Sequence, residues 1–375
     1  MRGTVAQAFR YRALDMGEFK PGLEGVVAFQ TEIAEPDREG GALRYRGVDI
    51  EELVGRVPYE RVWGLLVDEN LDPGMPEPEP YQPKSLSGDA PADLQAETAR
   101  LSSEWGLRKL VDIDASEARD DLARLSAQMM SIVAKSAAVS EGREPATDDV
   151  VARGDTAAEK FLLRWRGTAD PDHVKAIDTY WICTAEHGLN ASTFTARIVA
   201  STGADCGAAM SAAVGALSGP LHGGAPARVL PMLDEVAATG DPEGYVKDIL
   251  DRRGKIMGFG HRVYRAEDPR SRILKRAAEE LGSPRFEVAE ALEEAALTEL
   301  QRRKPDYVIA TNVEFYSAVV LDVAEIPPDL TPAMFACSRV AGWSAHILEE
   351  KRTGRLIRPS AEYVGPHSRS LESVG

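Results

Sequence analysis

The sequence has few cysteines and no apolar leader, and each absence excludes a class of protein. Its three cysteines, Cys183, Cys206 and Cys337, are widely spaced and form no CxxC or Cys/His metal motif. We therefore expect buried thiols in a reducing cytoplasm rather than a disulfide framework. The first twenty residues carry charges throughout and lack the apolar core of a signal peptide.

The chain also lacks a concentrated basic segment. Its 375 residues include 44 Lys and Arg against 60 Asp and Glu, which gives a formal net charge of −16 at pH 7. Because an acidic surface repels phosphate backbones and anionic headgroups, we expect neither nucleic acid nor a membrane as a partner. The longest uncharged stretch, residues 206–227, is too weakly hydrophobic to span a membrane. We expect a buried helix there that ends in a tight loop.

Helix signals dominate the sequence after a short segment, residues 22–49, in which β-type runs alternate with turn residues. Residues 71–91 contain six prolines, which predicts a surface loop. Residues 92–138 place apolar side chains at helical spacing. With few convincing strands and no fixed repeat, the predicted fold class is mainly α.

Three later helices have clear start and stop residues. Asp-Pro, Ser-Pro and Thr-Pro pairs open them, and a glycine or proline follows the last turn of each. They should occupy residues 268–282, 283–305 and 331–354.

Three of the six histidines lie in unusual local sequences: His187 in AEHGLNAST, His222 in GPLHGGAP and His261 in GFGHRVY. A glycine-rich turn lets backbone approach a ligand closely, which suits catalysis, although a lone histidine is more often structural. The remaining histidines are expected to be structural or on the surface: His173, His346 and His367.

Known fingerprints for metal and nucleotide binding are missing. The gaps between the three unusual histidines are 35 and 39 residues, without any HxxxH spacing, so we expect no metal site. Neither GxGxxG nor GxxxxGK[ST] occurs, and no GxSxG elbow is present.

Four charged residues are candidates for substrate contact or catalysis. Arg270 stands at a predicted helix start, which favours an anion, although a solvated first-turn arginine fits the local sequence equally well. Arg339 lies in the otherwise uncharged run MFACSRVAGWSAHI, so its charge needs a protein acid or an anionic substrate. Arg358 is a weaker candidate, because basic residues commonly follow helix ends. Burial of Glu314, in TNVEFYSAVVL, would raise its pKa and favour a base, whereas exposure would make it a helix-start acid.

These segments together resemble the citrate synthase family over about residues 21–365. The six that carry the resemblance, in chain order, are GLEGVVAFQTEIAEPDREGGALRYRGVDI, EHGLNASTFTARIVAST, ALSGPLHGGAPARVLPML, GFGHRVYRAEDPRS, TNVEFYSAVVLDVAEIPP and SRVAGWSAHILEEKRTGRLIRP. The resemblance implies a cytoplasmic homodimer with a two-domain helical fold. A large domain (1–224 and 328–375) would dimerise and bind oxaloacetate, and an inserted small domain (225–327) would carry the CoA loop and the base.

The resemblance also implies a reaction, in which acetyl-CoA condenses with oxaloacetate and water to give citrate and CoA, with no metal or redox cofactor. Glu314 would be the base at the thioester methyl group, His222 the donor to its oxygen, and His261 the group that polarises the keto oxygen. The two carboxylates of oxaloacetate would be held by His187, Arg270, Arg339 and, from the other subunit, Arg358. The residues implied in CoA binding are Leu221, Lys255, Ile256, Met257, Gly258 and Gly260.

One position departs from the family pattern, because an aspartate usually stands where this chain has Glu314. A displacement of about 1 Å in a catalytic group can cost on the order of 100-fold in rate. Two alternatives to a citrate synthase therefore stay open. One is a 2-methylcitrate synthase using propionyl-CoA, since one methylene is worth only about 1–3 kcal/mol in discrimination. The other is a weakly active paralogue that binds CoA or a dicarboxylate.

Overall fold

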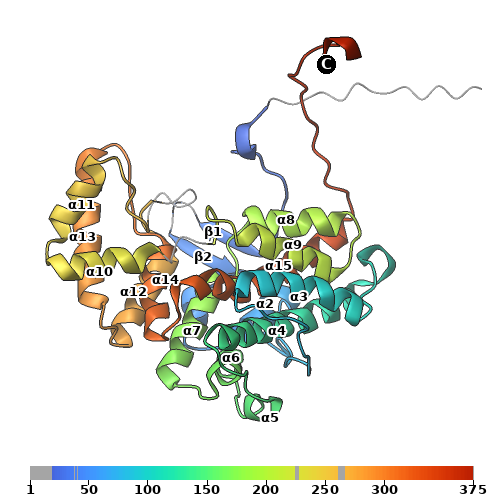
Figure 1. The fold of residues 1–375 in the computed structure, drawn as a ribbon, viewed down its shortest axis with the longest axis horizontal. Helices are drawn as coiled ribbons and strands as arrows, with labels where there is room; N and C mark the ends of the chain where they lie inside the picture. Colours follow the sequence, from blue (N-terminus) through green and yellow to red (C-terminus); the bar gives the residue numbers. More distant parts are fainter. Residues whose placement is uncertain (1–18, 38, 40, 224–227, 261–266, 375) are drawn as a thin grey trace, which may run out of the picture. The chain divides into compact units, whose positions relative to one another are not determined.

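The computed structural model describes residues 19–37, 39, 41–223, 228–260 and 267–374 (Figure 1). The chain divides into two compact units, one formed by residues 1–30 and 357–375 and the other by residues 31–356. We call them the terminal unit and the main unit. The described part of the terminal unit includes two short 3-10 helices, Pro21–Leu23 and Leu371–Ser373.

Helices make up most of the main unit, which confirms the predicted fold class (Figure 1). They are α1 (Ile50–Leu53), α2 (Tyr59–Asp68), α3 (Ala90–Glu104), α4 (Ala115–Ser140), α5 (Asp148–Val151), α6 (Ala157–Arg166), α7 (Pro171–Thr184), α8 (Ala191–Ser201), α9 (Cys206–Leu217), α10 (Val229–Thr239), α11 (Pro242–Asp251), α12 (Pro269–Glu280), α13 (Phe286–Arg303), α14 (Val313–Val323) and α15 (Thr331–Thr353). None of the described helices is both long and apolar enough to cross a membrane.

A small antiparallel sheet precedes the helices. Its strands pair in the order β1 (Ala34–Asp37), β2 (Ala42–Tyr45) and β3 (Val48–Asp49), as the strand-and-turn pattern predicts for this stretch. Leu43 and Tyr45 alternate with more exposed residues and are fully buried. The Tyr45 hydroxyl donates to the Ile182 carbonyl at 2.9 Å, which fastens the sheet to the C-terminal end of α7.

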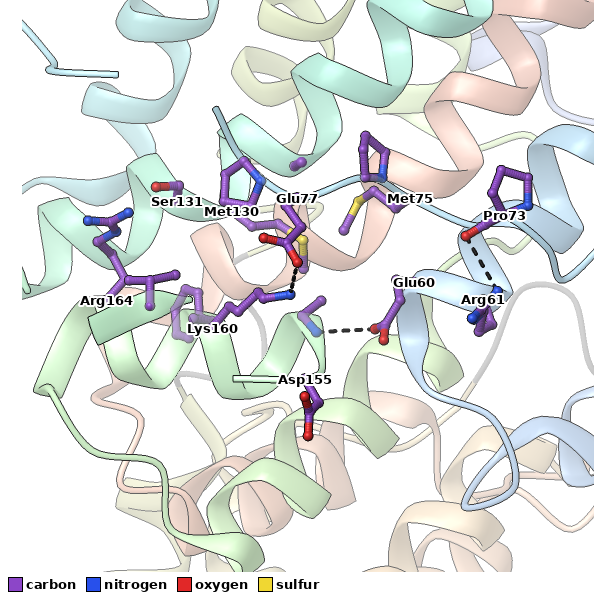
Figure 2. Close-up of a pocket in the computed structure, with 16 residues that line it drawn as sticks. Glu60, Arg61, Pro73, Met75, Glu77, Met130, Ser131, Asp155, Lys160 and Arg164 are labelled. Carbon is purple, nitrogen blue, oxygen red and sulfur yellow. Dashed lines mark hydrogen bonds and ion pairs between the residues drawn. The ribbon is translucent and has the colours of Figure 1, made fainter. Parts of the chain in front are cut away.

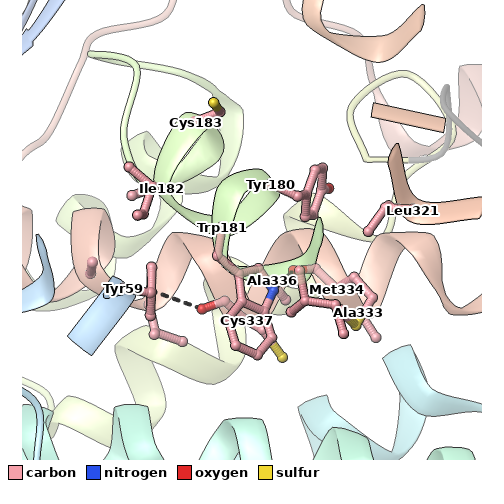
Figure 3. Packing of buried hydrophobic residues seen from close by; sticks show 14 of the residues in the cluster. Tyr59, Tyr180, Trp181, Ile182, Cys183, Leu321, Ala333, Met334, Ala336 and Cys337 are labelled. Carbon is pink, nitrogen blue, oxygen red and sulfur yellow. Dashed lines mark hydrogen bonds between the residues drawn. The ribbon is translucent and has the colours of Figure 1, made fainter. Parts of the chain in front are cut away.

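Helix α15 lies at the centre of the main unit, in contact with α2, α4, α7, α8 and α9 (Figure 1). Figure 3 shows the packing where α2, α7 and α15 meet. There Trp181 Nε1 donates to the Met334 carbonyl at 3.2 Å, and the Tyr59 hydroxyl donates to the Cys337 carbonyl at 3.0 Å. A helix covered on all sides has no solvent face for charged residues. Arg339, in the middle of α15, is therefore placed inside the core.

Local signals predicted the later helix boundaries well. Helix α12 is capped by Asp268 and followed by Gly282 at φ +62°, as predicted. Helix α15 ends before Gly354, which adopts the left-handed conformation. The prediction that the Ser283-Pro284 pair opens α13 is wrong, since the helix begins two residues after Pro284, at Phe286. The Ser283 hydroxyl accepts from the backbone two residues on and so closes a turn ahead of the helix.

Several broader expectations can also be compared with the structure. Residues 92–138 fall on two helices, α3 and α4, and Leu110 lies in the 3-10 turn between them. The stretch beginning at residue 206 opens with the buried helix α9, as predicted. Residues 307–311, YVIAT, consist largely of β-forming residue types but are not a strand, because Thr311 alone among them forms a bridge, with Phe259. All three cysteines are free and buried, which confirms the expectation of buried thiols.

Residues 71–89 contain neither helix nor strand, and α3 begins at Ala90, inside the predicted proline-rich loop.

Farther along, α10, α11 and α13 pack on one another, whereas α12 and α14 pack together and against α7 (Figure 1). These five helices lie within the range expected for the inserted small domain. Its boundaries at residues 225 and 327 stay a prediction.

Candidate active site

Five of the residues singled out in the sequence line one cavity of about 150 Å³ in the main unit. They are His187, His222, Arg270, Glu314 and Arg339. The rest of its lining comprises Tyr180, Thr184, Val313, Ser317 and Phe335. Helices α7, α12, α14 and α15 supply most of the wall, so residues far apart in sequence meet because these helices pack together. The cavity combines two arginines, two histidines and one carboxylic acid.

Arg339 is the most unusual of these residues, because its charge is buried and no ion pair with it is found among the described residues, although the buried carboxylate of Glu186 acts on it electrostatically. Its side chain is 3% exposed, and Nε donates to the Thr184 carbonyl at 2.6 Å. Within the part of the chain that the structure describes, Nη1 is buried and has no hydrogen-bond partner. Burial lowers the pKa of Arg339. Since an unsatisfied buried donor costs about 1–3 kcal/mol, and more when charged, this arginine is suited to bind a ligand oxygen.

Arg270 has a different environment. It lies in the first turn of α12, where Nε donates to Asp268 Oδ1 at 2.9 Å and Nη2 donates to Asp268 Oδ2 at 2.8 Å. Both side chains are almost completely buried. A fork bonded in this way is held in one orientation, which suits recognition of a planar carboxylate.

Glu314 is the second residue of α14, and its backbone N–H donates to the side chain of the cap residue Asn312 at 3.0 Å. Burial raises the pKa of Glu314 above its ordinary value, as predicted. Arg270 opposes this shift and Asp268 adds to it. A carboxylate whose pKa is raised in this way is a stronger base than a solvated glutamate once it is ionised.

His222 lies in the turn after α9 and is neutral near pH 7. Burial, assisted by the charge of Arg339, lowers its pKa to about 4. The Ser192 backbone N–H lies 3.3 Å from Nε2, and the Ser192 hydroxyl lies 2.9 Å from the same atom. Because a backbone N–H can only donate, Nε2 is the acceptor and the ring proton is on Nδ1. His222 can therefore act as a neutral hydrogen-bond donor.

Ser192 was missed in the sequence, as were the aromatic residues of the cavity wall. The serine sits in the short polar run NAST at the start of α8, thirty residues before its histidine, and no local spacing connects the two. Phe335 lies four residues before Arg339 on α15, and its ring lies 4.7 Å from the guanidinium carbon. Helical spacing from the buried arginine is the signal that could have suggested Phe335.

The other predicted contact residues lie elsewhere or are not described. His261 lies outside the described residues. Arg358 is an exposed residue of the terminal unit. Leu221 is fully exposed beside His222.

The segment expected to bind CoA, residues 255–260, is connected by hydrogen bonds to Asn312, the cap residue of the helix that contains Glu314. Lys255 at its start is exposed. The Asn312 backbone N–H donates to the Gly258 carbonyl and its side chain donates to the Gly260 carbonyl, each at 2.9 Å. The expected CoA segment and the candidate base are therefore neighbours.

A larger cavity, about 230 Å³, lies beneath the proline-rich loop between α2, α4 and α6 (Figure 2). Two of its cationic residues form ion pairs, Lys160 with Glu77 at 2.8 Å and Arg164 with Asp148. None of the sequence-predicted site residues lines this cavity, and it contains no histidine. The described residues also include no cluster of His, Cys, Asp and Glu arranged for a metal ion. We therefore place the candidate chemistry in the smaller cavity.

Comparison with known proteins shows the family of the chain. Residues 22–360 match the family model described as "Citrate synthase, C-terminal domain". A Mycobacterium tuberculosis protein named "Putative citrate synthase 2" is 60% identical over 359 residues, which cover 95% of each chain. A "Citrate synthase 2" of Bacillus subtilis is 35% identical, with coverage of 94% of this chain and 98% of the relative.

Solved structures show the same similarity. A ternary complex of citrate synthase from Thermoplasma acidophilum with carboxymethyl coenzyme A and oxaloacetate has a TM-score of 0.80 at 29% identity, covering 94% of this chain and 98% of that one. Citrate synthase from Pyrobaculum aerophilum has a TM-score of 0.77 at 33% identity, covering 94% and 95%. The fold and these similarities thus define a mainly helical enzyme of the citrate synthase type. The chain belongs to the citrate synthase family.

Proposed function

We propose that the cavity binds oxaloacetate and condenses it with acetyl-CoA to give citrate and CoA. The observation that carries this proposal is the buried Nη1 of Arg339, which has no acceptor in the described residues, beside a second buried arginine, Arg270. Two fixed guanidinium groups in a cavity of this size match a small molecule with two carboxylates. The Thermoplasma relative was solved with oxaloacetate and a CoA analogue, which supports the same substrates here.

The residue chemistry accounts for the first bond change. Glu314, as the ionised base, takes a proton from the thioester methyl group, and His222 Nδ1–H donates to the thioester oxygen as negative charge develops there. The carbon so activated attacks the keto carbon of oxaloacetate, and His261 gives the proton that the keto oxygen needs. Water then cleaves the thioester of the product, which releases CoA. These steps need no metal and no redox cofactor.

The remaining assignments extend the proposal to binding and assembly. His187, together with the two cavity arginines, would hold oxaloacetate, and Arg358 would be contributed by the second subunit of a cytoplasmic homodimer. Leu221 and the segment 255–260 would bind CoA. Closure of residues 225–327 over the substrates would exclude water until the carbon–carbon bond has formed.

The acyl group can be identified by measuring free CoA released from acetyl-CoA and from propionyl-CoA in the presence of oxaloacetate. A protein-only blank corrects for the three cysteines, which are buried and should react slowly. Faster turnover of acetyl-CoA is the expected result. Preference for propionyl-CoA would instead indicate methylcitrate formation. Release from neither, by protein that still binds oxaloacetate, would mean that the longer Glu314 side chain has left a binding paralogue.

A further inference from the structure

Three helices of this chain begin with an aspartate cap followed by proline, and one of the three differs from the others. Asp170 caps α7 by accepting from the backbone of Asp172 and His173, and Asp241 caps α11 by accepting from Gly244. Both aspartates are exposed, and their recorded side-chain hydrogen bonds stay within their own helices. Asp268, which caps α12, is 1% exposed.

Asp268 forms hydrogen bonds beyond those needed for a cap. Its Oδ1 accepts from the Arg270 backbone N–H at 3.1 Å, which is the capping bond, and from Arg270 Nε at 2.9 Å. Its Oδ2 accepts from Arg270 Nη2 at 2.8 Å and from the Val313 backbone N–H at 3.1 Å. The last bond joins α12 to the first residue of α14. One buried carboxylate therefore contacts both an arginine of the cavity and the residue directly before Glu314.

We infer that Asp268 is a positioning residue, which holds Arg270 and the first turn of α14 as one unit. The oxaloacetate carboxylate that Arg270 binds and the carboxylate of Glu314 would then keep a fixed separation during the reaction. This inference rests on the proposed function and adds a residue to which no role has been assigned. The constraint matters because Glu314 has one more rotatable bond than an aspartate, so only a fixed backbone limits where its carboxylate can go.

Asp268 also balances the charge around the base. The titratable and charged groups that line the cavity with Glu314 are Arg270 on α12, Arg339 on α15, Tyr180 on α7, and His187 and His222 on the connecting turns. Asp268 raises the pKa of Glu314 and Arg270 lowers it. Removal of the Asp268 charge would remove the effect that raises the pKa of Glu314 and keep the effect of Arg270 that lowers it, so the acid limb of activity would move to lower pH.

The first test is the isosteric substitution Asp268→Asn. The matched controls are D170N and D241N, which change the other two aspartate caps, and neither of those residues lines the cavity. In D268N we expect kcat to fall about 100-fold. The KM for oxaloacetate should rise, and the acid limb of the kcat profile should shift to lower pH. The two control variants should keep the wild-type kcat, KM and pH profile. A merely structural cap would not shift the pH profile of the folded enzyme.

The second test removes only the donor on α14. Val313 is the first helical residue, where proline is tolerated, and the preceding Asn312 has the extended conformation that proline requires, with φ −98° and ψ 172°. V313P deletes the N–H that donates to Asp268, whereas V313A keeps it and still shortens the side chain. We expect kcat about tenfold lower in V313P than in V313A, with equal KM for oxaloacetate.

The two tests separate failure of this inference from failure of the proposed function. Wild-type protein that neither releases CoA nor binds oxaloacetate would overturn both. An active wild type with D268N matching D170N in kcat and pH profile would overturn the positioning role alone. If D268N does not fold, the V313P and V313A pair decides, and equal kcat in that pair would sink the inference.

Discussion

Two buried arginines, Arg197 on α8 and Arg339 on α15, differ in how their charge is balanced. Arg197 on α8 is 1% exposed, and Nη1 donates to Glu349 Oε2 at 2.6 Å while Nε donates to Glu350 Oε2 at 3.0 Å. His346 Nδ1 lies 3.0 Å from the same guanidinium. Arg339 is almost as deeply buried, but the described residues provide it with one backbone carbonyl and the Phe335 ring, and with no ion pair.

The difference distinguishes a structural charge from a functional one. A buried charge costs several kcal/mol unless nearby groups compensate it, and the two glutamates next to Arg197 provide that compensation within the protein. For Arg339 the described compensation is weaker, because the buried carboxylate of Glu186 raises its pKa without an ion pair and Nη1 lacks an acceptor. Arg197 thus stabilises the packing of α8 on α15, whereas the incomplete compensation of Arg339 is what the proposed binding of an anionic substrate would explain.

The largest expected effect that tests this contrast is on catalysis. Arg339→Leu should lower kcat/KM for oxaloacetate by on the order of 100- to 1000-fold, because a desolvated charge-assisted contact is lost. The free energy of unfolding of this variant should stay the same or rise, since leucine removes a buried charge that has no ion pair among the described residues. Steady-state kinetics and urea unfolding of the same preparation measure both. A large loss of stability would show that the charge of Arg339 is already compensated within the folded protein.

The next effect is on stability. Arg197→Leu leaves Glu349 and Glu350 buried without their cation, so we expect the free energy of unfolding to fall by about 3–5 kcal/mol. The KM for oxaloacetate of the folded fraction should not change. Arg302→Leu, at an exposed arginine that is also paired with a glutamate, serves as the control and should cost about 1 kcal/mol or less. Equal losses in the two variants would contradict the structural role of the Arg197 cluster.

The smallest expected effect is on pH dependence. Glu314 must be ionised to accept a proton, and burial raises its pKa, so kcat should fall as pH decreases through a value above the ordinary range of glutamate. His222, with a pKa of about 4, is mostly neutral above about pH 5, so its own titration affects only the acid end of the profile. A kcat profile from pH 4 to pH 8 at saturating substrates should show the same acid limb in wild type and Arg197→Leu. A limb at the ordinary glutamate pKa would argue against Glu314 as the base.

Much of the fold could be predicted because the helix signals are local. The Asp-Pro start and glycine stop of α12 lie within fifteen residues, and backbone hydrogen bonding alone makes them effective. The start of α13 was misplaced because Ser283 forms a turn with its own neighbours, an alternative that serine always offers.

The site was partly predictable for a related reason. Arg339 stood out as one charge within an apolar run, and burial follows from that pattern alone. The hydrogen bond of Ser192 with His222 and the bond of Asp268 to α14 depend on how distant helices pack, so single-sequence patterns carry no sign of them. Residue types thus indicated the chemistry, and helix packing determined which groups meet.

Calorimetric titration of oxaloacetate into wild type, Arg339→Leu and Arg197→Leu tests the central claim most directly. The account predicts that wild type and folded Arg197→Leu bind with equal affinity, and that Arg339→Leu binds on the order of 100-fold more weakly. Wild-type affinity in Arg339→Leu would contradict the account, because oxaloacetate would then bind equally well without the charge of Arg339.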